Sequence, residues 1–263
     1  MKRSAFVLLV LAALFLAAAL FGGDTHSRTS GGGDARTPVV AELFTSEGCS
    51  SCPPADLLLQ KFDAQPIPGA QLIVLSEHVD YWNHIGWTDP YSSSAYSERQ
   101  SAYGKRFQLD SVYTPQLVVD GSNEVVGSDS SQARKAFNQA VTAEKVPIRI
   151  SAAILESNVV KAHVETGPLP ARPGKADIVF VVALNHAESQ VAGGENSGRR
   201  LTHVAVVRSL TKVGSIDAGQ SFAQDVSVKI EKGIDPAELR VIAFLQEPGP
   251  GKILGASREK LSH

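Results

Sequence analysis

Residues 48–54 read Gly-Cys-Ser-Ser-Cys-Pro-Pro and contain both cysteines of the chain. They follow an apolar run, residues 39–44, and precede apolar side chains at helical spacing over residues 55–62. Two thiols three positions apart across the first turn of a helix can form a disulfide without backbone rearrangement, and the helix N-terminus stabilises a thiolate on the first. The segment therefore predicts a strand, a redox motif and a helix, with Cys49 as nucleophile and Cys52 as resolving thiol.

A structural staple is an alternative use for this cysteine pair. In the chain-entropy model so small a ring contributes only about 2 kcal/mol, against roughly 4 to 5 kcal/mol for a loop of about 100 residues. An exported chain that used its one disulfide for stability would gain more from distant partners. The spacing leaves three interpretations open: a redox motif, a metal clip and an inert disulfide.

The N-terminus has the pattern of an export signal. Lys2 and Arg3 precede an unbroken apolar stretch, residues 5–21, and a segment rich in Gly, Ser and Thr follows over residues 22–37. No Ala-x-Ala site ends the stretch, and its length is near the lower limit for spanning a bilayer. We therefore expect residues 1–21 to be a signal peptide or an N-terminal anchor, residues 22–37 to be a flexible linker, and the protein to be exported, periplasmic or extracellular.

The overall composition limits the classes of partner. The 263 residues are 43% hydrophobic and 20% charged, which is ordinary for a globular chain long enough for two cores. A formal net charge of -2 argues against a nucleic-acid partner, because phosphate binding needs a concentrated basic surface. We expect membrane contact only through a possible uncleaved N-terminal anchor, and no bound cofactor.

Strand and helix signals alternate over the first half of the chain. Two apolar runs and the helix between them, over residues 39–76, predict a parallel strand pair with a right-handed crossover. A helix is predicted over residues 92–107, and a β-hairpin over 117–127, where Asp-Gly separates two apolar runs. Ser130 and Ser131 are expected to cap a last helix.

Short alternating segments dominate after Pro147. Examples are residues 148–152, 159–164, 178–184 and 240–245, and turn residues separate most of them. This pattern predicts an antiparallel all-β domain, a sandwich of about seven strands. We expect residues 38–146 and 147–263 to form two separate domains.

The order of elements over residues 38–143 resembles thioredoxin. A strand, a Cys-x-x-Cys helix, a parallel strand, an X-Pro that leads into a hairpin and a final helix follow one another. The resemblance implies a thioredoxin-like α/β fold for residues 38–146 and a cis peptide at Thr114-Pro115, facing the dithiol. It also implies that the backbone of Thr114 pairs with an extended substrate, while Pro115 keeps a competing donor away from the sulfurs.

The parallel strands bring polar and aromatic residues toward Cys49. The carboxyl ends of such strands share one edge of a sheet, so Glu77, His78, Asp80, Tyr81 and Trp82 are expected near the motif, the last four as candidate substrate-binding residues. His78 either takes the proton of Cys49, joins both sulfurs in binding Cu(I) or zinc, or is structural. The aromatic side chains either wall a substrate groove or fill the core.

Two acidic residues precede the motif. Glu42 interrupts an apolar strand at a place where thioredoxin-like proteins often keep a buried carboxylate as a proton relay, although the strand has another face to which it can point. Glu47 would oppose formation of a thiolate on Cys49 if it lies close.

The densest polar segment of the second half spans residues 193–203 and is followed by residues 204–208. It can bind an anion, dock on the first half, or satisfy its own backbone as a long loop. Together with residues 42–56, 78–82 and 113–116, residues 194–208 resemble a family of exported, thioredoxin-like proteins classified as a domain of unknown function. The resemblance implies a thioredoxin half joined to a β half and carries no settled reaction.

We predict an exported thiol-disulfide oxidoreductase that acts on protein or small-molecule disulfides. In this hypothesis Cys49 attacks, Cys52 resolves, and the β half recruits a protein partner; the direction of electron flow stays open, because the potential depends on both thiols. One alternative is a Cu(I) or zinc carrier that uses both cysteines and His78. Another is a non-catalytic interaction module.

Overall fold

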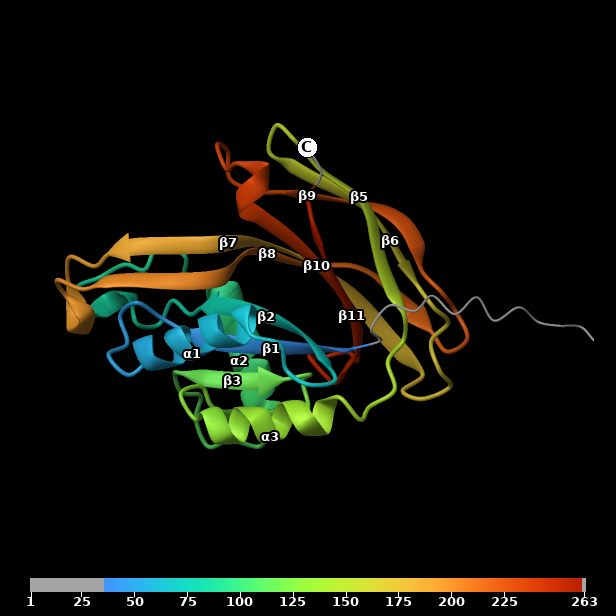
Figure 1. Cartoon of the computed structure of the whole chain (residues 1–263), viewed down its shortest axis with the longest axis horizontal. Coiled ribbons are helices and arrows are strands. Elements are labelled where there is room, and N and C mark those ends of the chain that lie inside the picture. Colours follow the sequence, from blue (N-terminus) through green and yellow to red (C-terminus); the bar gives the residue numbers. More distant parts are fainter. Residues whose placement is uncertain (1–35, 262–263) are drawn as a thin grey trace, which may run out of the picture. The chain divides into compact units, whose positions relative to one another are not determined.

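A mixed sheet of eight strands runs through most of the chain in the computed structural model, which describes residues 36–261 (Figure 1). Its order is β11-β10-β7-β8-β2-β1-β3-β4. In chain order its strands are β1 (Thr37–Thr45), β2 (Ala70–His78), β3 (Gln116–Val119), β4 (Asn123–Val126), β7 (Lys175–Gln190), β8 (Arg200–Asp217), β10 (Leu239–Gln246) and β11 (Ile253–Lys260). β2 pairs in parallel with β1 and β8, and the other neighbours are antiparallel.

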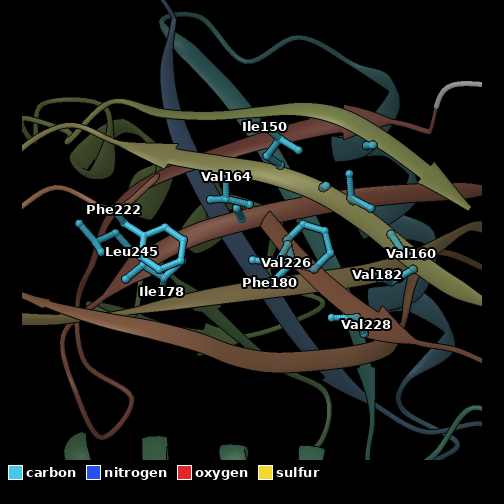
Figure 2. Close-up of a cluster of buried hydrophobic side chains, with 14 of the residues drawn as sticks. Ile150, Val160, Val164, Ile178, Phe180, Val182, Phe222, Val226, Val228 and Leu245 are labelled. Carbon is cyan, nitrogen blue, oxygen red and sulfur yellow. The ribbon is translucent and has the colours of Figure 1, made fainter. Parts of the chain in front are cut away.

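A smaller antiparallel sheet has the order β5-β6-β9. Its strands are β5 (Ile148–Glu156), β6 (Val159–Thr166) and β9 (Ala223–Lys229). Apolar side chains from this sheet meet those of β7 and β10 in one buried cluster, whose members include Val164, Val226 and Phe180 (Figure 2). The small sheet therefore covers one face of the second-half strands of the large sheet.

The described residues contain three α-helices, α1 (Pro53–Ala64), α2 (Ser94–Arg106) and α3 (Ser130–Ala140), and three short 3-10 turns, η1 (Asn83–Ile85), η2 (Gly194–Asn196) and η3 (Pro236–Glu238). Side chains alternate between the faces of β1. Leu43 packs in the cluster formed with α1 and α3, whereas Val40 and Phe44 pack in clusters formed with α2. The helices thus cover both faces of the first-half strands.

The caps of these helices explain where they begin. Cys52 is the N-cap of α1, and proline occupies its first turn, where a missing N–H costs nothing. Ser93 caps α2 by accepting from the backbone of Ala95. The cap of α3 is Asp129, which accepts from the backbone of residues 131 and 132, rather than Ser130 or Ser131 as predicted.

The predicted fold class is wrong. Instead of a thioredoxin-like α/β fold followed by a separate antiparallel β domain, the chain forms a mostly β mixed sheet with a second, three-stranded sheet. The cause is β8, which pairs with β7 along its length and with β2 at Ser76 and Val206. The first part of β8 lies in and just after the polar segment for which a long loop was one interpretation, so the strand that joins the two halves was not predicted.

The core on the α2 side of the large sheet also crosses the expected boundary near residue 146. Val40, Ile73 and Tyr96 share one buried cluster with Val207 and Phe244. Residues from Arg36 onward accordingly form one compact unit.

The predicted signal and linker lie outside the described residues, apart from Arg36 and Thr37, the second of which begins β1. Among residues 36–261, no helix combines the length and apolar character needed to cross a membrane.

A fragment ending at residue 146 tests the shared core. It would expose Val40, Ile73 and Leu75, which are fully buried in the whole chain. Exposing each such side chain costs about 1.5–3 kcal/mol, a large part of the roughly 5–15 kcal/mol that stabilises a domain. We expect fragment 36–146 to show no cooperative urea transition by circular dichroism. A transition midpoint matching that of chain 36–263 would contradict the shared core.

Candidate functional site

Cys49 and Cys52 form a disulfide at the N-terminus of α1. Both cysteines are fully buried, whereas Ser50 and Ser51 between them are exposed. Ser51 Oγ lies 3.3 Å from Cys49 Sγ. The sulfurs therefore lie just beneath a surface that the two serines form.

The Thr114-Pro115 segment faces this disulfide. Its peptide bond is cis, as predicted. The carbonyl oxygen of Thr114 lies 3.9 Å from Cys49 Sγ and accepts a 3.4 Å hydrogen bond from Ser51 Oγ. A Cβ added to Gly127 would lie 3.1 Å from Pro115 Cβ and 3.2 Å from Ala55 Cβ, so only glycine lets this loop pack so closely on α1.

The predicted substrate-binding residues after β2 divide into two groups. Trp82 lies at the motif: its indole Nε1 donates to Thr114 Oγ1 at 2.9 Å, and a Cβ on Gly48 would lie 3.0 Å from Trp82 Cβ. Asp80 accepts from Ser97 Oγ at 2.6 Å, and the Tyr81 hydroxyl donates to Gln100 at 3.0 Å. Asp80 and Tyr81 are thus tied to α2, and Trp82 is tied to the loop that faces Cys49.

His78 is fully buried at the end of β2. Its Nδ1 lies 2.7 Å from Asp89 Oδ2, and its ring meets that of His203 edge to face, with 4.6 Å between centroids. Burial raises the pKa of Asp89, but His78 and two backbone N–H groups outweigh burial and hold that pKa below its ordinary value. No group of three or more His, Cys, Asp or Glu side chains within residues 36–261 is arranged to hold a metal ion.

A buried charged cluster adjoins the motif. His203 Nε2 lies 3.2 Å from Glu47 Oε1, and His203 Nδ1 lies 3.8 Å from Asp56 Oδ2. Trp87 Nε1 donates to the other oxygen of Glu47 at 2.8 Å, and Thr45 Oγ1 donates to Asp56 at 2.9 Å. Burial lowers the pKa of His203, but Asp56 and Glu47 outweigh it and raise that pKa to about 10. His203 is therefore a cation at neutral pH and offsets the charge of Glu47.

Glu42 does not face the motif. Its carboxylate accepts from Arg99 Nε at 2.6 Å and from the Tyr103 hydroxyl at 2.5 Å, both on α2. Leu43, the next residue, points toward α1, so Glu42 lies on the opposite face of the sheet. The predicted proton relay from Glu42 to Cys49 is incompatible with this placement.

Glu77 lies beside Glu42 on the α2 side of the sheet. It is fully buried, and its nearest cation is Arg99, whose Nε lies 3.7 Å from Glu77 Oε2. Burial raises the pKa of Glu77 well above its ordinary value; the charge of Glu42 raises it further, and Arg99 lowers it. Glu42 is the ion-pair partner of Arg99, and the environment of Glu77 favours its neutral form.

The tip of the β7–β8 hairpin docks on the motif. Asn196 Nδ2 donates to the carbonyl oxygens of Glu47 and Cys49, at 2.8 and 2.9 Å. Glu195 Oε2 accepts from the backbone N–H of Ser50 at 3.0 Å. Two of the three roles considered for residues 193–203 are seen. The tip docks on the first half, and it also satisfies part of its own backbone, as in the hydrogen bond from Arg199 N–H to the Asn196 carbonyl at 3.1 Å.

Several residues at the site were missed by sequence reasoning. Asp56 carried a usable signal, because it lies four residues after Cys52 and so on the same side of the helix. Asp89 carried none, because it reaches the motif through contacts between segments far apart in the chain. Asn196 lay in the polar segment for which docking on the first half was one interpretation, but its backbone partners were not predicted.

Residues 40–246 match the family described as protein of unknown function (DUF1223), and the chain belongs to that family. It is similar to the crystal structure of protein AGR_C_4864 from Agrobacterium tumefaciens, with 28% identity and a TM-score of 0.64, covering 87% of this chain and 98% of that one. A domain of the outer membrane lipoprotein Omp28 from Porphyromonas gingivalis has 13% identity and a TM-score of 0.28 over 45% of this chain and 89% of that one, which supports no argument. No curated protein matches the chain.

Removing the cation beside the motif should destabilise the fold. We expect His203→Gln to cost about 3–5 kcal/mol in urea unfolding at pH 6, because Glu47 and Asp56 lose their buried partner. His186→Gln, at an exposed position of β7, is the matched control and should change stability by less than about 0.5 kcal/mol.

The pH dependence of that loss follows from the raised pKa of His203. Its stabilisation is complete below the ordinary pKa of 6.5 and is lost as the pH rises through about 10. The difference in unfolding free energy between wild type and His203→Gln should therefore shrink as the pH is raised from 6 to 8 to 10. A gap that stays constant contradicts the charged state of His203.

The two buried glutamates on the α2 side should respond differently to amide substitution. Glu42→Gln removes the charge that pairs with Arg99, and breaking a buried pair costs about 3–5 kcal/mol. Glu77→Gln replaces a group whose pKa is raised with a neutral one of similar shape, and we expect a loss below about 1.5 kcal/mol. Urea unfolding at pH 7 compares the stabilities of the two variants. Equal losses would contradict the assignment of a charged Glu42 and a neutral Glu77.

Proposed function

We propose that this chain is an exported thiol-disulfide oxidoreductase whose reacting group is the Cys49–Cys52 pair. The observation that carries the proposal is the position of that disulfide, at the N-terminus of α1 and opposite the Thr114 carbonyl, 3.9 Å from Cys49 Sγ. A helix N-terminus favours a thiolate on the first cysteine of such a pair. Export is proposed from the pattern of residues 1–21.

In the reduced protein, the Cys49 thiolate attacks one sulfur of a partner disulfide. A bond forms between Cys49 Sγ and that sulfur, and the partner's other sulfur leaves as a thiolate. Cys52 gives its proton to the departed partner thiolate or to water and attacks Cys49 Sγ. The internal disulfide forms, the bond between Cys49 and the partner breaks, and the partner's second sulfur leaves as a thiolate that takes a proton from water. Two electrons pass from the cysteine pair to the partner; the same steps reversed oxidise a partner, and the potentials of both couples set the direction.

The surrounding residues have defined tasks in this proposal. The Thr114 carbonyl accepts a hydrogen bond from the backbone of an extended substrate, and Pro115 presents no N–H that competes for it. Trp82 fixes the Thr114 side chain through the 2.9 Å hydrogen bond from its indole. His203 offsets the charge of Glu47, which otherwise disfavours a thiolate on Cys49 two residues later.

One observation favours a Cu(I) or zinc carrier as a second candidate, although residues 36–261 contain no preformed group of three His, Cys, Asp or Glu ligands. Within the described chain His78 Nε2 has no hydrogen-bond partner, while His78 Nδ1 is hydrogen-bonded to Asp89. This arrangement is typical of metal-binding histidines. A competition titration of reduced protein with Cu(I), run beside a disulfide-exchange assay, separates the candidates. Tight 1:1 binding that His78→Ala abolishes, with no measurable exchange, favours the carrier.

Trapping the mixed disulfide tests the oxidoreductase. Cys52→Ser removes the resolving thiol, so we expect Cys49 to accumulate covalent adducts with partner disulfides, visible on non-reducing gels and by mass spectrometry. Cys49→Ser is the matched control and should trap far less. In reduced protein, alkylation against pH should give Cys49 a pKa below about 7.5 and Cys52 a higher one. Equal titrations near about 8.5 contradict the assignment of the nucleophile.

A further inference from the structure

The sulfurs of the motif are covered although the motif lies at the surface. Cys49 and Cys52 are fully buried, and the serines between them are exposed. Thr114 and Trp82 adjoin the motif from the first half of the chain. The hairpin tip, residues 191–199 between β7 and β8, adjoins it from the second.

Two side chains fasten the hairpin tip to the motif. Asn196 is fully buried and donates both hydrogen bonds of its amide to motif carbonyls, at 2.8 Å to Glu47 and 2.9 Å to Cys49. Arg199 donates to Asn196 Oδ1 at 2.8 Å and so orients that amide. Glu195 accepts from Ser50 N–H at 3.0 Å. The amide nitrogen of Asn196 therefore joins the tip to the motif, and its oxygen is held by Arg199 within the tip.

The backbone of the hairpin tip packs closely on the loop after β2. A Cβ on Gly193 would lie 2.1 Å from the Gly86 carbonyl oxygen, and one on Gly194 would lie 3.3 Å from Trp87 Cβ. Gly194 also has a φ of +68°, which favours glycine. Two adjacent glycines thus let the tip rest on the loop after β2, beside the motif.

We propose that Glu195 and Asn196 are specificity-determining residues for the exchange proposed above, and that they select protein disulfides over small ones. This inference rests on the proposed function. In this proposal a partner reaches Cys49 by displacing the tip, which breaks the hydrogen bonds to two buried carbonyls and to the exposed N–H of Ser50. Leaving the buried carbonyls without partners is costly. An extended polypeptide carries donors and acceptors that replace those bonds, whereas a small disulfide carries few.

The first test is the rate at which dithiothreitol reduces the Cys49–Cys52 disulfide in the full chain. Asn196→Ala removes two hydrogen bonds of about 1 kcal/mol each, so we expect reduction to accelerate roughly 10- to 100-fold. Glu195→Gln should accelerate it a few-fold. Arg200→Ala, which removes an exposed pair with Glu188 on the same hairpin, is the control and should leave the rate within about two-fold.

Urea distinguishes release of the tip from loss of the fold. Reduction through local opening depends weakly on urea below the unfolding transition, whereas reduction through global unfolding depends on it steeply. If Asn196→Ala is reduced at the same rate as wild type, or faster only through global unfolding, the hairpin tip does not control access to the disulfide and the proposal is overturned. If Asn196→Ala does not fold, Glu195→Gln decides by the same criteria.

The second test measures selectivity with reduced protein. The substrates are a disulfide-bonded peptide and hydroxyethyl disulfide. Wild type should favour the peptide, and Asn196→Ala should narrow that preference at least five-fold by accelerating the small substrate. A preference that Asn196→Ala leaves unchanged overturns the role in specificity. Absence of exchange with every disulfide overturns the proposed function instead. The rates of reduction by dithiothreitol still test whether the hairpin tip controls access to the disulfide.

Discussion

Pairing of β8 with β2 is the constraint on which the rest of the structure depends. It turns the sheet of the first half and the sheet of the second into one, and it fixes the direction of the long β7–β8 hairpin (Figure 1). At one end, β7 supplies Phe180 to the core beneath the small sheet. At the other, the hairpin carries Asn196 to the Cys49 carbonyl.

The same hairpin completes the electrostatics of the site. Buried carboxylates are tolerated only when paired, and Glu47 and Asp56 obtain their cation, His203, from β8. On the opposite face of the sheet, Arg99 of α2 provides the equivalent partner for Glu42. Two separate charged clusters therefore lie on the two sides of β1, and only the one containing His203 adjoins the cysteines. In the proposed function, the charged groups that act on the cysteines are therefore those of the β8 side.

Local patterns predicted the first-half elements, because periodicity and turn residues act over short stretches. The meeting of Cys49 with Thr114 was predicted only from the resemblance to thioredoxin, since no local pattern identifies it. The joined sheet was not predictable in this way. Residues 204–207 are apolar, but they follow a polar, glycine-rich segment, and their pairing with β2 bridges more than 100 residues. The face to which Glu42 points was equally hidden, since both faces of β1 are buried. Asn196 acts through backbone carbonyls, which every residue possesses, so no sequence pattern identifies its partners.

Redox titration of the Cys49–Cys52 pair distinguishes an exchange site from a structural staple most directly. The full-length protein is equilibrated in glutathione or dithiothreitol buffers of known potential, and the reduced fraction is measured by alkylation and mass spectrometry. An exchange site predicts a midpoint between about −270 and −120 mV, the range of disulfide oxidoreductases. A midpoint below about −300 mV, where structural disulfides lie, would contradict a role in exchange.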